Sequence, residues 1–308
     1  MKNGPDSAFN RRESNEFGKN VCIVLKIMRH GERDTDAKLT DYGREVTRKR
    51  AQESGIKSGE FDMVKAIGSD AGLADGAGAR AFETADIYAH EVGNANVGTS
   101  RINRTLSYET LKNSAPYDHI AIYNSHLPTN YADLPNDEKS KAAKKAQAAT
   151  IDHFVNLDTE EAHKYKREIA GSFATVIRHH AKMSKRLHSG SNVLIPAGTH
   201  GGTMEVILQQ ALVRDVHGQS VTGFRSLQEV GGEFDPSEAF NVFIERDESG
   251  NLKEYRITFD NPSRNMPTEG LKLDSAKVDE LADYYEALHR DDVSELESDS
   301  DSLKPQIA

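Results

Sequence analysis

Short apolar runs that end at glycine-containing polar turns set the pattern of this chain. Residues 21–28 form the clearest run, rich in β-branched side chains, and it stops at Arg29-His30-Gly31-Glu32. A run too short for a buried helix and closed by a glycine predicts a buried parallel strand. Residues 63–67, which end at Gly68-Ser69-Asp70, and residues 192–198 have the same pattern and predict two further strands.

Segments between these strands carry helical periodicity. The first opens at Thr40, a good N-cap, with Asp41 at the positive end of the helix dipole, and Gly55 fits its C-terminal end. Apolar stripes at helical spacing predict the other helices. They are expected over residues 79–91, from about 137, over 159–187, over 204–213 and over 275–289.

The remaining β-structure is predicted at residues 96–99 and in a hairpin of residues 239–246 and 254–259. Alternating strands and helices predict an α/β fold, a three-layer α/β/α sandwich with a mainly parallel central sheet. No linker separates residues 107–190 from the strand predicted at 192–198, so we expect this segment to be a helical insertion or cap and not a second domain.

The two ends of the chain are polar. Residues 1–20 predict a flexible leader without the apolar core of a secretory signal, and the acidic residues 291–308 predict a disordered tail. A single domain is therefore expected over residues 21–290. Cys22 is the only cysteine; it cannot form an internal disulfide, and inside a strand it is expected to be a small buried hydrophobe. These features favour a cytoplasmic location.

Charge and hydropathy exclude two classes of partner. The formal net charge is −10, which argues against non-specific binding to nucleic acid. Because much of this charge lies in the tail, the body is only mildly acidic and is compatible with a locally cationic pocket. No stretch approaches the roughly 18 apolar residues of a membrane span, so no membrane partner is expected.

Three strand-to-helix junctions carry candidate chemistry: Arg29 with His30, the loop that leads to Arg80, and His200. Parallel strands bring such junctions to one edge of a sheet, where open α/β sheets place their ligand sites. A crevice with two histidines and two arginines suits phosphoryl transfer to a neutral imidazole, with fixed cations on the phosphoryl oxygens. Taken alone, Arg29-His30-Gly31 is equally compatible with a polar turn in which His30 only caps the strand.

Four motifs stand in order along the chain. They are Ile27-Met28-Arg29-His30-Gly31-Glu32, Leu39-Thr40-Asp41-Tyr42-Gly43-Arg44, Arg80-Ala81-Phe82-Glu83-Thr84-Ala85 and His200-Gly201-Gly202-Thr203. With these motifs the sequence resembles the histidine phosphatase superfamily, in its phosphoglycerate-mutase-like branch. The likeness covers residues 21–259 with an unmatched central segment.

This resemblance implies a role for each matching residue. His30 would be the phosphorylated nucleophile, and Arg29, Arg80 and His200 would bind the phosphoryl oxygens. Glu109 is the candidate general acid, with Glu32, Asp34 and Asp36 as alternatives. Arg33, Gly201 and Ser69 are the candidate substrate-binding residues. Neither a metal nor a cofactor is implied.

Two positions depart from the family pattern. Arg33 stands where the family often carries serine or threonine, and Asp36 stands where it often carries asparagine; Arg33 would then supply a replacement cation. The chain also has no tryptophan, whereas the glycolytic mutases carry a tryptophan-containing segment after the signature.

We therefore expect a metal-independent phosphatase that hydrolyses phosphomonoesters through a phosphohistidine. The expected partner is a small phosphorylated metabolite or a phosphoprotein; the sequence does not indicate the oligomeric state. The alternatives are a phosphoglycerate or phosphosugar mutase and a catalytically weak regulatory protein that binds a phospho-ligand. Outside this constellation, Arg44 is expected to face solvent or form a salt bridge. The pair His179-His180 is expected to lie at the surface, because no second ligand pair stands at metal spacing.

Overall fold

The fold was analysed in a computed structural model of the chain. It describes residues 16–34, 36, 38–57, 59–70, 79–93, 96–107, 115–264, 266–267 and 269–289. The predicted tail, most of the predicted leader and the candidate acid Glu109 lie outside the described residues. No helix in the described part of the chain combines the length and the apolar character needed to cross a membrane.

Ten strands of the described chain form one sheet, and the α/β class is confirmed. The pairings among β1 to β5 are parallel, and those that join β1 to β8 and continue outward are antiparallel. The strands follow the order β4-β3-β5-β1-β8-β9-β10-β6-β7, with β2 also paired to β5. Their bounds are β1 Cys22–Arg29, β2 Met63–Val64, β3 Ile67–Gly68, β4 Arg101–Ile102, β5 Asn192–Thr199, β6 Leu212–Val216, β7 Gln219–Thr222, β8 Ala239–Glu245, β9 Tyr255–Phe259 and β10 Lys272–Leu273.

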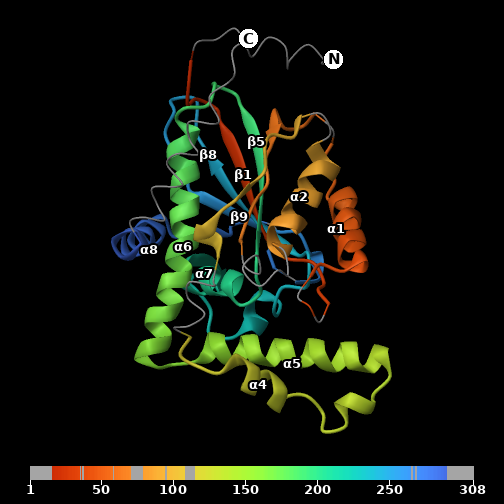
Figure 1. The fold of residues 1–308 in the computed structure, drawn as a ribbon. Coiled ribbons are helices and arrows are strands. Elements are labelled where there is room, and N and C mark those ends of the chain that lie inside the picture. The colour runs from red at the N-terminus through yellow and green to blue at the C-terminus, as the bar shows by residue number, and fades with distance from the viewer. Residues whose placement is uncertain are drawn as a thin grey trace.

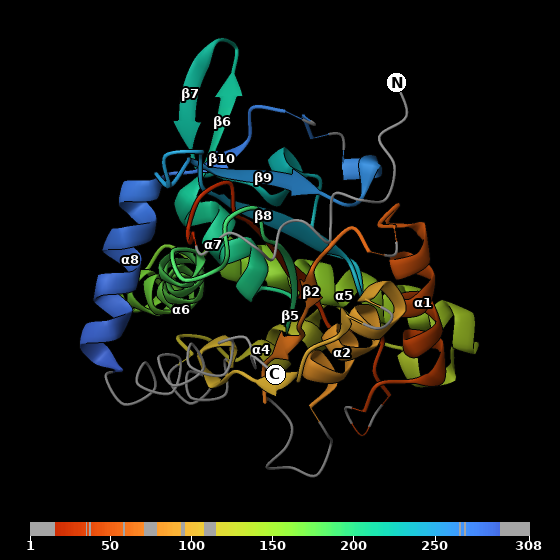
Figure 2. The same cartoon turned by 90° about the horizontal axis from the view of Figure 1, so that it is seen from above.

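Helices lie on both sides of the sheet. Viewed from above, α1 and α2 lie on one side and α6 and α8 on the other (Figure 2). The helix bounds are α1 Asp41–Glu53, α2 Arg80–Gly93, α4 His119–Ser125, α5 Asn136–Asn156, α6 Glu160–Ser184, α7 Thr203–Ala211 and α8 Ser275–Leu288. Short 3₁₀ turns occur at η4 Arg104–Leu106, η5 Tyr131–Asp133, η6 Leu227–Val230 and η7 Pro262–Arg264.

Strand β1 explains why both faces of the sheet are covered. Successive side chains of a strand point to opposite faces. Accordingly, Ile23, Leu25 and Ile27 belong to the larger apolar cluster, which includes the α6 side chains, while Val24 and Met28 belong to a second cluster with residues of α2. Each burial of such a side chain removes apolar surface from water, which is the main stabilising term of the fold. The apolar run of residues 21–28, interrupted only by Lys26, thus reflects a strand buried on both faces.

The segment expected to be an insertion divides into two parts. Helix α6 packs against α8 and the sheet and contributes to the main core. Helices α4 and α5 instead lie across one end of the sheet, below the strands as drawn in Figure 1. None of the α4 residues is buried, whereas the C-terminal end of α5 buries Phe154 and Val155. The α4–α5 arm (residues 115–156) is therefore anchored mainly at this end.

The clearest difference from the sequence prediction follows α7. The predicted helix over residues 204–213 ends at Ala211, and the chain continues directly into a hairpin of β6 and β7. At its turn, His217 and Gly218 both have positive φ, 55° and 79°, as a type I′ turn requires. The strand predicted at residues 96–99 also lies elsewhere. Pairing with β3 occurs at Arg101–Ile102, while Val97, inside the predicted range, forms only an isolated bridge with Val64.

Candidate active site

The two candidate histidines lie side by side because of the register between β1 and β5. Arg29 pairs with Thr199 at the carboxyl ends of these parallel strands, so His30 and His200 are the next residue of each. The backbone N–H of His30 donates to the carbonyl of Thr199 at 2.8 Å. Their ring centroids are 5.1 Å apart with an interplanar angle of 64°, and both residues are buried, with exposures of 6% and 5%.

The hydrogen bond of His30 defines its reactive nitrogen. Nδ1 lies 2.7 Å from the carbonyl oxygen of Gly31. A carbonyl oxygen can only accept, so in this contact Nδ1 carries the proton and the Nε2 of a neutral ring carries the lone pair. Burial, followed by the charges of Arg80 and Arg29, holds the pKa of His30 well below its usual value. The imidazole is therefore neutral at physiological pH and has the form that a nitrogen nucleophile needs.

The turn after His30 is tied to helix α2. The Gly31 N–H donates to the hydroxyl of Thr84 at 2.9 Å, and that hydroxyl donates to the carbonyl of Arg80 at 2.8 Å. A Cβ on Gly31 would stand 2.7 Å from Leu39 Cδ1, so the close packing of this turn requires glycine. Thr84 thus couples the nucleophile's loop to the helix that carries Arg80.

Helix α2 approaches the strand ends at contact distance, which places Arg80 beside the histidines. A Cβ on Gly198 would lie 1.9 Å from the carbonyl oxygen of Ala81, and one on Gly68 would lie 2.4 Å from Phe82 Cα. Only glycine at these two positions leaves room for the helix backbone. Arg80 is the first residue of α2 and is buried, and its charge acts on the pKa of both histidines.

Arg29 is the last residue of β1, directly before His30, and its charge acts on both histidines. It is buried, and its Nη1 donates to the carbonyl of Phe234. Among the residues that the structure describes, its Nε is buried without a hydrogen-bond partner. A Cβ on Gly201 would come 3.0 Å from that Nε, so glycine at 201 leaves space for the guanidinium. Burial lowers the pKa of Arg29, and among the groups that raise this pKa the carboxylate of Glu205 has the largest effect.

Arg33 is the exposed cation of the site. It follows β1 in the loop bridged by the pair Arg33 and Leu39, and its positive charge lowers the pKa of His30 and of His200. For His200 burial is the largest cause, followed by His30. The same charge reaches Tyr123 of α4, whose pKa is raised chiefly by burial. Tyr123 of the α4–α5 arm is therefore close enough to Arg33 to be affected by its charge.

The arm is also joined to the loop that supports Arg29. Lys144 of α5 forms a 2.6 Å ion pair with Asp235, and the ring of Phe154 is the nearest side chain to Gly202, with 3.9 Å to a Cβ built there. The arm thus contacts the loop of residues 231–238 and lies near the turn that follows His200.

Other predicted residues have distinct positions. Ser69 is fully buried, and its N–H donates to the carbonyl of Gly198 at 3.0 Å, which places it at the end of β3. Of the three alternative acids, Glu32, Asp34 and Asp36 are all exposed. Asp34 accepts the N–H of Lys38 at 2.8 Å and so closes its own loop.

Sequence reasoning missed four residues that support the crevice: Glu205, Phe234, Glu238 and Arg264. Glu238 and Arg264 form a buried ion pair, and the Arg264 guanidinium lies 3.8 Å above the centre of the Phe234 ring. Phe234 and Glu238 follow Gly231-Gly232, and Arg264 follows Asn261-Pro262-Ser263, so their sequence context predicts only turns. The one usable signal was Glu205, a glutamate in the first turn of a helix, which is typical of a capping residue.

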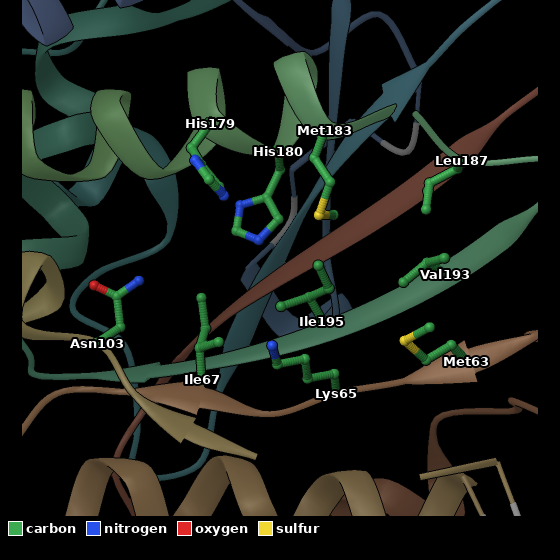
Figure 3. Close-up of a pocket in the computed structure, with 10 residues that line it drawn as sticks. All are labelled: Met63, Lys65, Ile67, Asn103, His179, His180, Met183, Leu187, Val193 and Ile195. Atoms are coloured by element: carbon green, nitrogen blue, oxygen red, sulfur yellow. The ribbon is translucent and has the colours of Figure 1, made fainter. Parts of the chain in front are cut away.

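A separate cavity lies between α6 and strands β2, β3 and β5 (Figure 3). It is lined by Met63, Lys65, Ile67, Asn103, His179, His180, Met183, Leu187, Val193 and Ile195. The prediction that the histidine pair lies at the surface was wrong for His180, which is 4% exposed. Its Nδ1 bonds the carbonyl of Val176 one helical turn earlier. The cavity volume of about 20 Å³ is suitable for about one water molecule.

No group of three or more metal-binding side chains occurs in the described chain. No family model matches the sequence, and no curated protein matches it. Solved structures that are similar to this chain include the following two. A mycobacterial glucosyl-3-phosphoglycerate phosphatase is 12% identical with a TM-score of 0.38, over 77% of this chain and 97% of its own. A phytase from Klebsiella sp. ASR1 is 12% identical with a TM-score of 0.39, over 87% and 95%.

Proposed function

We propose that this chain is a metal-independent phosphatase that hydrolyses phosphomonoesters through a phosphohistidine on His30. The observation that carries the proposal is the state of this imidazole: buried, neutral, and bonded through Nδ1 to the Gly31 carbonyl, so that Nε2 is the nucleophilic nitrogen. Arg29, Arg80 and His200 stand around it. Cations fixed in a poorly solvated site stabilise the charge that develops on a transferring phosphoryl group.

The reaction would proceed in two displacements at phosphorus. In the first, Nε2 of His30 forms the N–P bond, the P–O bond to the alcohol breaks, and a carboxylic acid protonates the departing oxygen. In the second, water attacks phosphorus, the N–P bond breaks with its electron pair returning to Nε2, and the carboxylate takes the proton from water. Glu109 remains the proposed acid, on the family resemblance alone.

Arg33, Gly201 and Ser69 would complete the substrate site in different ways. Arg33 would add an exposed cation at the mouth, Gly201 leaves the space that the Arg29 guanidinium occupies, and the buried Ser69 would line the base. The proposed substrate class is a small phosphorylated metabolite or a phosphoprotein. The position of the α4–α5 arm, with Tyr123 close enough to respond to the charge of Arg33, supports a role of the arm in substrate selection.

The test is hydrolysis of 4-nitrophenyl phosphate in the presence of EDTA by the wild type, His30→Ala and His180→Ala. His180 is a matched control, because it is a second buried histidine whose Nδ1 bonds a backbone carbonyl. We expect turnover to be lost in His30→Ala and kept in His180→Ala. Wild type denatured during turnover at alkaline pH should carry a phosphoryl group that is stable to base and lost in acid.

Three results would contradict the proposed function. Undiminished hydrolysis by His30→Ala would refute the assigned nucleophile. A phosphorylated substrate that is isomerised without release of phosphate would identify a mutase, and phosphate binding without turnover over a panel of sugar phosphates, nucleotides and phosphopeptides would identify a regulatory protein.

A further inference from the structure

Glu205 is a fully buried acidic residue close to the histidine pair in sequence, with an exposure of 0%. It lies in the first turn of α7, shortly after His200, and the proposed chemistry does not use it. Burying a carboxylate is costly unless hydrogen bonds and opposite charge compensate it. The hydrogen-bond donors and the positive charge around Glu205 therefore indicate the role of its carboxylate.

The two carboxylate oxygens of Glu205 accept from two different segments. Oε2 accepts the N–H of Gly202 at 2.7 Å, a local contact that caps the start of α7. Oε1 accepts the N–H of Phe234 at 3.0 Å, although Phe234 lies 29 residues further along the chain. A capping role explains the first contact only, since a cap needs neither full burial nor a bond to a distant loop.

Phe234 connects this carboxylate to Arg29. Its N–H is held by Glu205 and its carbonyl accepts from Arg29 Nη1, so one residue stands between the anion and the guanidinium. The Gly202 peptide held by the other oxygen follows Gly201, against which the Arg29 side chain packs. Glu205 thus fixes both surfaces that confine Arg29.

The charges agree with this geometry. Among the carboxylates that raise the pKa of Arg29 against the lowering effect of burial, Glu205 has the largest influence. Burial raises the pKa of Glu205 itself, while the Phe234 N–H and then Arg29 lower it. The two groups therefore stabilise each other's charged form inside the protein.

We propose that Glu205 is a positioning residue that holds Arg29 in place for binding phosphoryl oxygens. The consequence for catalysis rests on the proposed phosphatase function, whereas the consequence for anion binding does not. Misplacing a binding group by about 1 Å can cost on the order of 100-fold in rate, so the position of this guanidinium has a measurable effect.

The test uses Glu205→Gln, which keeps the size of the side chain. An amide accepts through one oxygen only and presents N–H donors to the second backbone N–H, so one of the two contacts is lost. We expect inorganic phosphate and orthovanadate to bind about 10- to 100-fold more weakly, with a matching loss of kcat/KM.

Glu229→Gln is the matched control. Glu229 also accepts two backbone N–H groups, from Arg225 at 2.9 Å and Ser226 at 3.0 Å, but it bonds to Arg214 and not to the crevice. The Glu229→Gln variant should have lower thermal stability and unchanged anion affinity. If the effect of Glu205→Gln were purely structural, both variants would change in stability and in anion affinity in the same way.

A double-mutant cycle with Arg29→Lys decides whether Glu205 acts through Arg29. If it does, Glu205→Gln should change phosphate affinity less than about twofold in the Arg29→Lys background, because coupled residues are not additive. An undiminished effect in that background, or wild-type affinity in Glu205→Gln, would overturn the proposal. If Glu205→Gln does not fold, Glu205→Asp, too short to reach both N–H groups, is judged by the same criteria.

Calorimetric binding of inorganic phosphate separates this inference from the proposed function. A wild type that binds phosphate without turnover would refute hydrolysis while leaving the affinity test of Glu205 intact. A wild type that binds neither phosphate nor vanadate would refute the anion site and, with it, the role of Glu205.

Discussion

Substitution of Glu238 is expected to be among the most destabilising single changes near the crevice. Its carboxylate and the Arg264 guanidinium form an ion pair of 2.5 Å, with side-chain exposures of only 1% and 2%. Glu238 also accepts the N–H of Asp235 at 2.6 Å, and Arg264 donates to the carbonyls of Val230, Gly232 and Glu233. The pair therefore holds the loop that carries Phe234.

Glu238→Gln leaves the Arg264 charge buried without its counter-ion. Removing one member of a buried pair costs about 3–5 kcal/mol, because the remaining charge stays desolvated. For a domain of this size that corresponds to a fall in melting temperature of roughly 6–20 °C, at about 2–4 °C per kcal/mol. Urea unfolding gives the free energy directly, from the shift of the midpoint at unchanged slope.

Glu254→Gln is the corresponding change in an exposed ion pair, since the side chains of Lys272 and Glu254 are 39% and 70% exposed. Such pairs contribute about 0–1 kcal/mol. The reasoning fails if Glu238→Gln loses less than about 1 kcal/mol, or if the two variants are destabilised equally. Replacing Glu238 and Arg264 together by apolar residues of similar size should cost less than Glu238→Gln alone, since no unpaired charge remains.

Two further outcomes are expected from close packing and from burial. Gly198→Ala should lower the free energy of unfolding by at least about 2 kcal/mol in urea, because its Cβ would overlap the Ala81 carbonyl oxygen at 1.9 Å. Gly98→Ala is the control and should be nearly neutral, since no neighbour lies nearer than 3.7 Å to its Cβ. Equal effects of the two substitutions would contradict this reasoning. Burial lowers the pKa of His180 from 6.5 to about 3. The unfolded chain therefore binds more protons between these values, and stability that is full above 6.5 is lost as the pH falls toward 3. His180→Gln should show a flatter stability profile over that range, and an unchanged slope would contradict the assignment.

Local chemistry explains why the sequence predicted the first part of the site well. The helix start at Thr40 was correct, and its hydroxyl accepts the Gly43 N–H at 2.9 Å. The strands that end at His30 and His200 were also placed within a residue. In each case a strand or helix boundary is determined by residues adjacent in sequence, through turn glycines and caps. Parallel pairing then brings the two strand ends together, as topology requires.

The remaining features depend on contacts between distant segments. Glu205 is the clearest case, because its sequence context predicts a cap and its bond to Phe234 depends on how the loop of residues 231–238 folds back. His180 is different: it stands three residues after Ile177 and four after Val176, so the helical pattern itself places this histidine on the buried face of α6. The hairpin after Ala211 was missed because its apolar residues continue the helical pattern, although His217-Gly218 is a turn signal.

The distribution of charge around Arg29 connects these observations. A chain with a net charge of −10 holds three arginines beside two neutral histidines. The carboxylates that act on Arg29 belong to Glu205, Glu233, Asp235 and Glu238, and those of Glu205 and Glu238 are bound to backbone N–H groups behind the guanidinium. Because fixed hydrogen bonds hold these two anions, they stabilise the buried cation without occupying its free Nε. Under the proposed function, Nε would therefore bond a phosphoryl oxygen without first giving up another partner, which limits the reorganisation that electrostatic stabilisation requires.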